Sequence, residues 1–205
     1  MRILTLSVLI ASLGRPEIVD RVAVRVGNAV IAESDILREI RLAAFLNGEP
    51  PDFGPGARRQ TAERLVDQRL IRKEIETGRY PEPEPSGVEA VLKEALTSRR
   101  DLSAYRISED DLKAHLTWQL TALRFIGLRF RTGVQIGDDE IERYFREKLA
   151  PKLEPGAAVG PYRAQIERVL IEERANQQAE LWLKETRQRT AIEFLPNVFP
   201  PEARP

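Results

Sequence analysis

The sequence predicts a mainly helical protein with a small β-sheet at which both ends of the chain meet. Apolar residues recur at helical spacing over most of the chain between residues 34 and 189, whereas residues 20–32 and 190–195 carry short β-type runs. A two-stranded hairpin is only marginally stable alone. We therefore expect the C-terminal strand to pair with the N-terminal hairpin as its third strand.

The N-terminal hairpin is the clearest local pattern. Residues 20–26 alternate valine with other side chains, and residues 29–32 form a second short apolar run. The intervening Gly27-Asn28 is typical of a two-residue hairpin turn. Ser34 is predicted to cap the first helix, which extends to Asn47.

The next two helices flank a proline-rich connector. Apolar residues spaced about four apart predict a helix over 57–77, with Gly78 as the residue that terminates it. Residues 80–85 are expected to be extended, because each residue before a proline disfavours helix. A third helix follows Ser86, and a turn with a short helix is expected over 99–107.

A long helix is predicted over 109–131, opened by a capping box of Ser108 and Asp111. Leucines 112, 116, 120 and 123 form one face, and aromatic residues widen it, so contacts on more than one side are expected. Another helix begins after Gly137, where three acidic residues favour its positive end.

The C-terminal part contains a predicted linker over 150–161, which holds three prolines and two glycines. A long final helix over 162–189 and a short strand over 190–195 follow, and residues 196–205 form a loose tail. Because both ends share one sheet in this scheme, residues 18–195 are interpreted as a single composite domain.

Residues 1–14 resemble a short signal peptide, with one basic residue, an apolar run and a small-residue cleavage site at Ser12-Leu13-Gly14. The alternative is a buried strand of the folded domain. No other stretch approaches the roughly 20 apolar residues of a membrane span, so no stable membrane insertion is expected.

Composition excludes several classes of chemistry. The chain has no cysteine and one histidine, which removes thiol nucleophiles, disulfides and Cys- or His-rich metal sites. Its 32 basic and 32 acidic residues balance, which argues against a nucleic-acid binder. No phosphate-binding or dinucleotide-binding glycine motif occurs, so no cofactor is expected.

Two polar clusters have simple structural explanations. His115 follows Asp111 by one helical turn, and such a pair on a solvated helix surface is a more economical interpretation than a catalytic dyad. The acidic run Asp138-Asp139-Glu140 is explained by helix capping rather than by a metal site. We expect no catalytic residue and no metal site.

With the polar clusters explained, the remaining candidates for a binding site are apolar side chains. Most are expected in the core, but a surface that takes extended polypeptide also needs aromatic and aliphatic walls and no titrating group. The candidate peptide-binding residues are Phe45, Leu46, Phe53, Tyr105, Phe125 and Phe130.

Four stretches, in order, resemble the family of periplasmic chaperones that includes SurA and the PpiC-type proteins. The hairpin and helix start over 22–36 are similar to the opening of that family, and residues 64–71 to its next helix. Residues 134–145 resemble the segment that precedes its parvulin domain, and residues 182–195 its closing helix and strand. The resemblance implies a SurA N-terminal-domain-like fold.

The same resemblance implies a function without prolyl isomerisation. Relatives carry one or two parvulin domains of about 90 residues where this chain has only residues 150–161. We therefore expect an ATP-independent periplasmic chaperone that binds unfolded outer-membrane or secreted polypeptides. The alternatives are an isomerase-related protein, an accessory subunit with one dedicated partner, and a helical DNA-binding regulator, which the neutral charge opposes. The sequence leaves clients and oligomeric state open.

Overall fold

The computed structural model describes residues 20–97 and 100–200, so the predicted signal peptide over 1–14 lies outside the described residues. Within them, the chain forms six α-helices and one three-stranded antiparallel sheet, which confirms the predicted mainly helical class. The elements are β1 (Val22–Val26), β2 (Ala29–Ala32), α1 (Glu33–Asn47), α2 (Pro55–Gly78), α3 (Pro85–Thr97), α4 (Glu109–Ile126), α5 (Asp138–Tyr144), α6 (Arg163–Arg189) and β3 (Ile192–Phe194).

The sheet joins the two ends of the described chain, as predicted. Its strand order is β2-β1-β3, with both neighbours antiparallel to β1. Gly27 adopts φ +57° in the hairpin turn, a conformation that glycine reaches without steric cost. Val24 lies opposite Phe194, so the last strand pairs side by side with the first.

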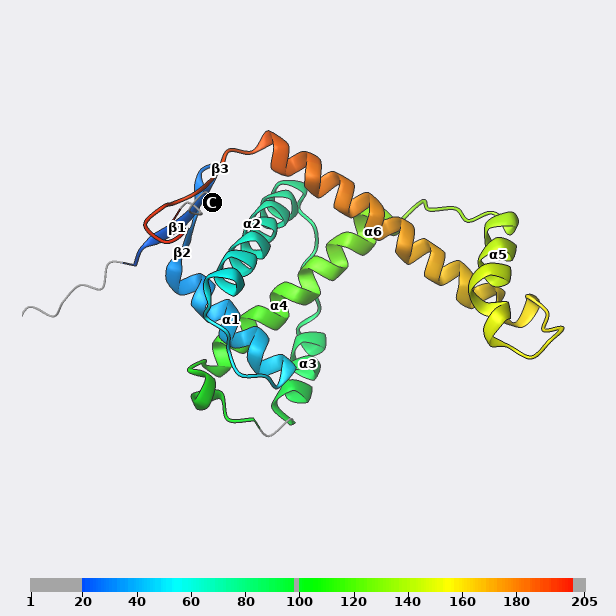
Figure 1. Cartoon of the computed structure of the whole chain (residues 1–205), viewed down its shortest axis with the longest axis horizontal. Helices are drawn as coiled ribbons and strands as arrows, with labels where there is room; N and C mark the ends of the chain where they lie inside the picture. The colour runs from blue at the N-terminus through cyan, green and yellow to red at the C-terminus, as the bar shows by residue number, and fades with distance from the viewer. Residues whose placement is uncertain (1–19, 98–99, 201–205) are drawn as a thin grey trace, which may run out of the picture.

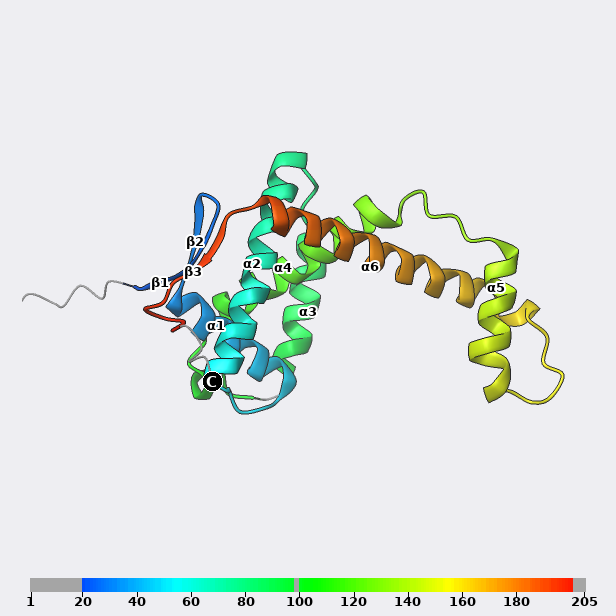
Figure 2. The ribbon, with the colours of Figure 1, turned by 45° about the horizontal axis from the view of Figure 1, so that its top comes forward.

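The molecule is elongated, with a body at one end and a small lobe at the other (Figure 1). The body contains the sheet and α1 to α4, and the lobe contains α5 with the first turns of α6. Helix α6 connects them, and its 27 residues correspond to about 40 Å at the rise of an α-helix. Figure 2 shows the same arrangement from a second direction.

Two of the body's cores adjoin each other. One lies between the sheet, α1 and α2, where Val24, Ile36 and Val66 are fully buried. The other lies between α1, α3 and α4 around Phe45 and Leu112. Helix α1 contributes to both cores, so it fixes the sheet relative to the α3–α4 pair.

The lobe has its own small core of Ile141, Phe145 and Ile166. Residues 150–161, predicted to be a linker, pack against this core through half-buried apolar side chains such as Leu153. The segment therefore closes the lobe at the far end of α6 and does not lie within the helical body.

Two predicted helix boundaries are wrong in detail. Helix α1 is capped at Ala32, whose N–H donates to Asp35, while the Ser34 hydroxyl bonds to Asp20. Helix α2 includes Gly78 and ends with Arg79 in the left-handed conformation at φ +52°. Asp35, one residue after Ser34, therefore supplies the capping side chain of α1, and Arg79, one residue after Gly78, terminates α2.

The predicted helix over 109–131 is present, but its last turn is π-helical from Gly127 to Arg131. The capping box is confirmed, because the Ser108 hydroxyl accepts from the Asp111 N–H and the Asp111 carboxylate accepts from the Ser108 N–H. The predicted leucine face is only partly right, since Leu123 is 65% exposed.

Candidate functional site

The six candidate residues are distributed over three places rather than gathered in one groove. Phe45 is fully buried, and its ring meets Tyr105 edge-on at 5.5 Å between centroids, with half-buried Leu46 packed on the same core. Phe53 is 41% exposed in the loop between α1 and α2. Phe125 and Phe130 lie together where α4 meets α6.

This third place contains an open, mainly apolar cavity of about 280 Å³. Phe125, Phe130 and Trp182 form its aromatic wall, with ring centroids 5.7 to 5.9 Å apart. An apolar cavity of roughly half this volume is enough to bind benzene. The remaining lining residues are Ile71, Ile126, Asn176, Ala179, Glu180 and Leu183.

Arg129 stabilises the back of this aromatic wall. Its guanidinium lies 5.4 Å from the Trp182 ring and 5.5 Å from the Phe130 ring, within cation–π range. The same group bonds to Glu74 at 2.5 Å and donates to the Tyr80 hydroxyl at 3.1 Å. The wall is therefore held in place by both α2 and the connector that follows it.

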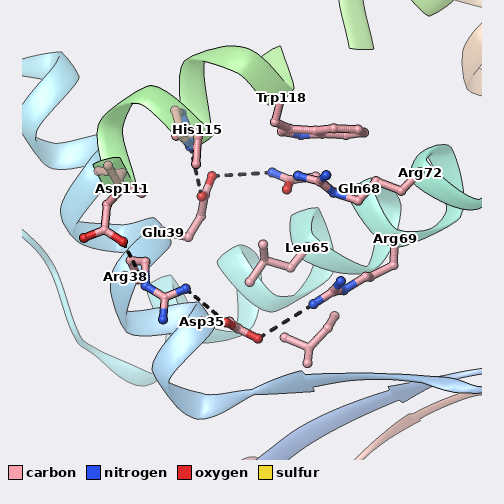
Figure 3. A pocket seen from close by; sticks show the side chains of 13 residues that line it. Asp35, Arg38, Glu39, Leu65, Gln68, Arg69, Arg72, Asp111, His115 and Trp118 are labelled. Atoms are coloured by element: carbon pink, nitrogen blue, oxygen red, sulfur yellow. Dashed lines mark hydrogen bonds and ion pairs between the residues drawn. The ribbon is translucent and has the colours of Figure 1, made fainter. Parts of the chain in front are cut away.

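A second pocket, of about 210 Å³, lies between α1, α2 and α4 and has charged walls (Figure 3). Arg38 of α1 approaches Asp35 at 3.3 Å and Asp111 of α4 at 3.5 Å, and Arg69 of α2 approaches Asp35 at 3.8 Å. Three helices are thus linked by charged contacts along the rim. These pairs are partly exposed, so each contributes little to stability.

The interior of this pocket corrects the prediction for His115. Its side chain is only 7% exposed, and Nδ1 lies 3.1 Å from Oε2 of Glu39, not beside Asp111. The side-chain amide nitrogen of Gln119 lies 2.9 Å from Nε2. Both ring nitrogens are therefore occupied by side chains of the fold.

The Glu39 carboxylate is the electrostatic centre of the cluster. Burial by itself would raise its pKa, but the hydrogen bond and charge of His115, with help from Arg64 and Gln68, more than compensate. The pKa of Glu39 consequently lies below its ordinary value, and the group is ionised at neutral pH.

This geometry does not assemble a nucleophilic site. None of the 13 residues lining the pocket carries a hydroxyl or thiol, so the Glu39–His115 pair has no nucleophile to activate. In the wall of the same pocket, the Arg72 guanidinium lies 4.0 Å from the centre of the Trp118 ring. The Glu39–His115 pair satisfies its own polar groups and connects α1 to α4.

Sequence reasoning missed the residues that complete both pockets. Trp182 follows Ala175 and Ala179 at helical spacing, a signal that marks one face of α6 but not what it packs against. Glu39 carries no local sign of pairing with His115, because 76 residues separate them. Such pairings depend on how the helices meet.

The acidic run Asp138-Asp139-Glu140 supplies the cap of α5, as predicted. Glu140 accepts a hydrogen bond from the Gly137 N–H, which caps the helix, and its other oxygen binds Arg174 of α6. Across residues 20–97 and 100–200, no group of three or more His, Asp or Glu side chains is arranged to hold a metal. No helix in those residues combines the length and apolarity required to cross a bilayer.

Comparison with protein-family models gives no match, and comparison with curated proteins gives none.

Proposed function

We propose that this protein is an ATP-independent chaperone of the periplasm, which holds unfolded outer-membrane or secreted polypeptides by reversible apolar contact. The open aromatic cavity between α4 and α6 is the observation that carries the proposal. Covering such a surface with a client side chain gives about 25 cal/mol for each Å² of apolar area removed from water. Holding by this means requires no covalent step.

The surroundings of the cavity support transient rather than permanent occupation. Leu123 and Leu181 are 65% and 62% exposed on α4 and α6, the two helices that form the cavity. Neither leucine lines the cavity, but exposed apolar side chains on these two helices add apolar surface for a client. Asn176 and Glu180 are the polar residues among those that line the cavity.

The resemblance to SurA-like and PpiC-type chaperones supports the same proposal. Both predicted ends of that module, the hairpin and the final strand, share one sheet here. Residues 150–161, the place of the isomerase domain in that family, pack against the lobe core of Ile141 and Ile166. We therefore favour a chaperone module without prolyl isomerase activity over an isomerase or a subunit dedicated to one partner.

The test is suppression of aggregation. A urea-unfolded outer-membrane porin is diluted into buffer without nucleotide, and light scattering is recorded with increasing amounts of this protein. Suppression at a few-fold excess is expected. Unchanged scattering at a large excess would remove the proposal, and catalysed isomerisation of a proline peptide would favour the isomerase alternative.

A matched pair of variants locates the activity. Ala179→Leu fills the cavity from within, and Ala164→Leu makes the same change at an exposed position of the same helix. The first variant is expected to lose most of the suppression and the second to retain it, with both unfolding like the wild type in urea. Equal activity of the two variants would place client binding elsewhere.

A further inference from the structure

The outer edge of β3 presents unpaired backbone groups. Gly27 N–H donates to the Ala191 carbonyl at 2.8 Å, and Leu195 N–H donates to the Ala23 carbonyl at 2.9 Å. Because strand residues alternate, the Ala191 carbonyl, Glu193 and the Leu195 N–H face β1, and Ile192 and Phe194 direct their backbone groups outward. Within residues 20–97 and 100–200, no group is hydrogen-bonded to these outward groups.

The opposite edge of the sheet is shorter. Arg25 lies opposite both Val30 and Glu193, and its backbone groups point to β3, so the Val30 groups point away from the sheet. The Ala32 N–H, the next outward donor, is occupied by the Asp35 carboxylate at 3.1 Å. Edge β2 therefore offers a single residue, whereas edge β3 offers two.

A large concavity adjoins the β3 edge. It has a volume of about 1130 Å³ and lies between β3 with its following turn and the first turns of α2. Phe194, Val198 and Phe199 give it an apolar wall, and the Arg59 guanidinium lies 3.5 Å from the centre of the Phe194 ring. Side chains of a strand added beside β3 would alternate between this concavity and solvent.

We propose that the outer edge of β3 binds an extended segment of an unfolded client as a fourth strand. The occupant follows from the hydrogen-bonding groups, because only extended backbone offers reciprocal N–H and C=O groups at the spacing of Ile192 and Phe194. Apolar side chains of that segment enter the adjoining concavity. The inference rests on the proposed chaperone function and identifies the conformation in which clients are held.

Ile192→Pro tests the edge directly. It removes one outward N–H while every bond from β3 to β1 keeps its donor and acceptor, since the amide hydrogen is the only hydrogen-bonding group that the substitution removes. The matched control, Val30→Pro, makes the same change at the β2 edge. The probe is a fluorescein-labelled peptide that alternates apolar and polar residues, and fluorescence anisotropy measures its binding.

Ile192→Pro is expected to weaken peptide binding about tenfold, as loss of one hydrogen bond and a steric clash with the added strand would do. Val30→Pro is expected to bind like the wild type. A peptide with every second amide methylated is expected not to bind. Equal binding of the methylated peptide, or of both proline variants, would overturn the proposal. Circular dichroism and urea unfolding establish that each variant is folded.

Hydrogen exchange gives a readout that does not depend on a variant. Peptide binding is expected to slow exchange of the Ile192 and Phe194 amides and to leave that of Val30 unchanged. Protection without peptide that rises with protein concentration would assign the edge to a second copy. Protection without peptide that disappears on removal of residues 201–205 would assign it to the chain's own tail. Either result overturns the proposal.

The proposed function and this inference fail in different ways. If the wild type suppresses porin aggregation but the Ile192 and Phe194 amides show no added protection, the chaperone function stands and strand pairing is excluded. If the wild type suppresses nothing, the chaperone function falls, and the inference falls with it.

Discussion

The polar pocket between α1, α2 and α4 and the aromatic cavity between α4 and α6 contrast in how their lining groups are paired. In the pocket between α1, α2 and α4, the buried carboxylate of Glu39 and the ring of His115 bond to each other, so the two buried polar groups at its centre satisfy each other. In the cavity between α4 and α6, Phe125 and Phe130 are 1% and 8% exposed and Trp182 is half-buried, so these rings line a mainly apolar hollow from within the fold. Polar groups can satisfy each other in pairs, whereas an apolar hollow gains free energy when an apolar group fills it.

The largest expected effect of a single substitution is at the centre of the aromatic cluster. Phe125 is 1% exposed and touches the rings of Tyr80, Phe130 and Trp182. Phe125→Ala is expected to lower the free energy of unfolding by about 3–5 kcal/mol, measured by urea denaturation. Leu181→Ala, at an exposed position of α6, is the control and should change it by less than about 0.5 kcal/mol.

The second largest effect on stability is expected at Glu39, in the polar pocket between α1, α2 and α4. Glu39→Gln removes the charge that His115 and Arg64 stabilise, and we expect it to lower the free energy of unfolding by about 1–2 kcal/mol at neutral pH. Because the pKa of Glu39 is lowered in the folded protein, this contribution is present above its ordinary value and is lost as pH falls through the folded value.

Urea denaturation of the wild type and Glu39→Gln, at neutral pH and in acid, measures this dependence. The difference between the two proteins is expected to shrink on acidification below about pH 4. Glu94→Gln, at an exposed position of α3, is the matched control. A difference between wild type and Glu39→Gln that grew in acid would contradict the interpretation.

The smallest effect concerns the Arg72–Trp118 contact on the wall of the polar pocket. Arg72→Ala is expected to lower the free energy of unfolding by about 0.5–1 kcal/mol through loss of the cation–π contact. Lys73→Ala, on the exposed face of the same helix, is expected to have no measurable effect in the same urea experiment. Equal losses in the two variants would contradict a specific role for the Arg72–Trp118 contact, because alanine has a higher helix propensity than either arginine or lysine.

The order of elements was available from the sequence because it depends on local physics. Period-2 valines with Gly27-Asn28 predicted the hairpin, and the Ser108–Asp111 box predicted the start of α4, since both signals act over a few residues. The docking of β3 on β1 was also predictable, because a two-stranded hairpin needs a further partner. For the six candidate binding residues, the sequence shows that each side chain is apolar or aromatic, but it does not show how exposed each one is.

Tertiary structure alone decided which side chains meet. Apolar periodicity identifies the buried face of a helix but not the neighbour that covers it, so the cavity formed by Phe125 with Trp182 was not predictable. The same holds for Glu39 and His115, which α1 and α4 bring together across 76 residues. The sequence by itself determined the helices, the sheet and the absence of thiol chemistry, because these follow from local conformation and composition. Helix packing decided which polar groups are satisfied and which apolar surface stays open, because both depend on contacts between distant segments.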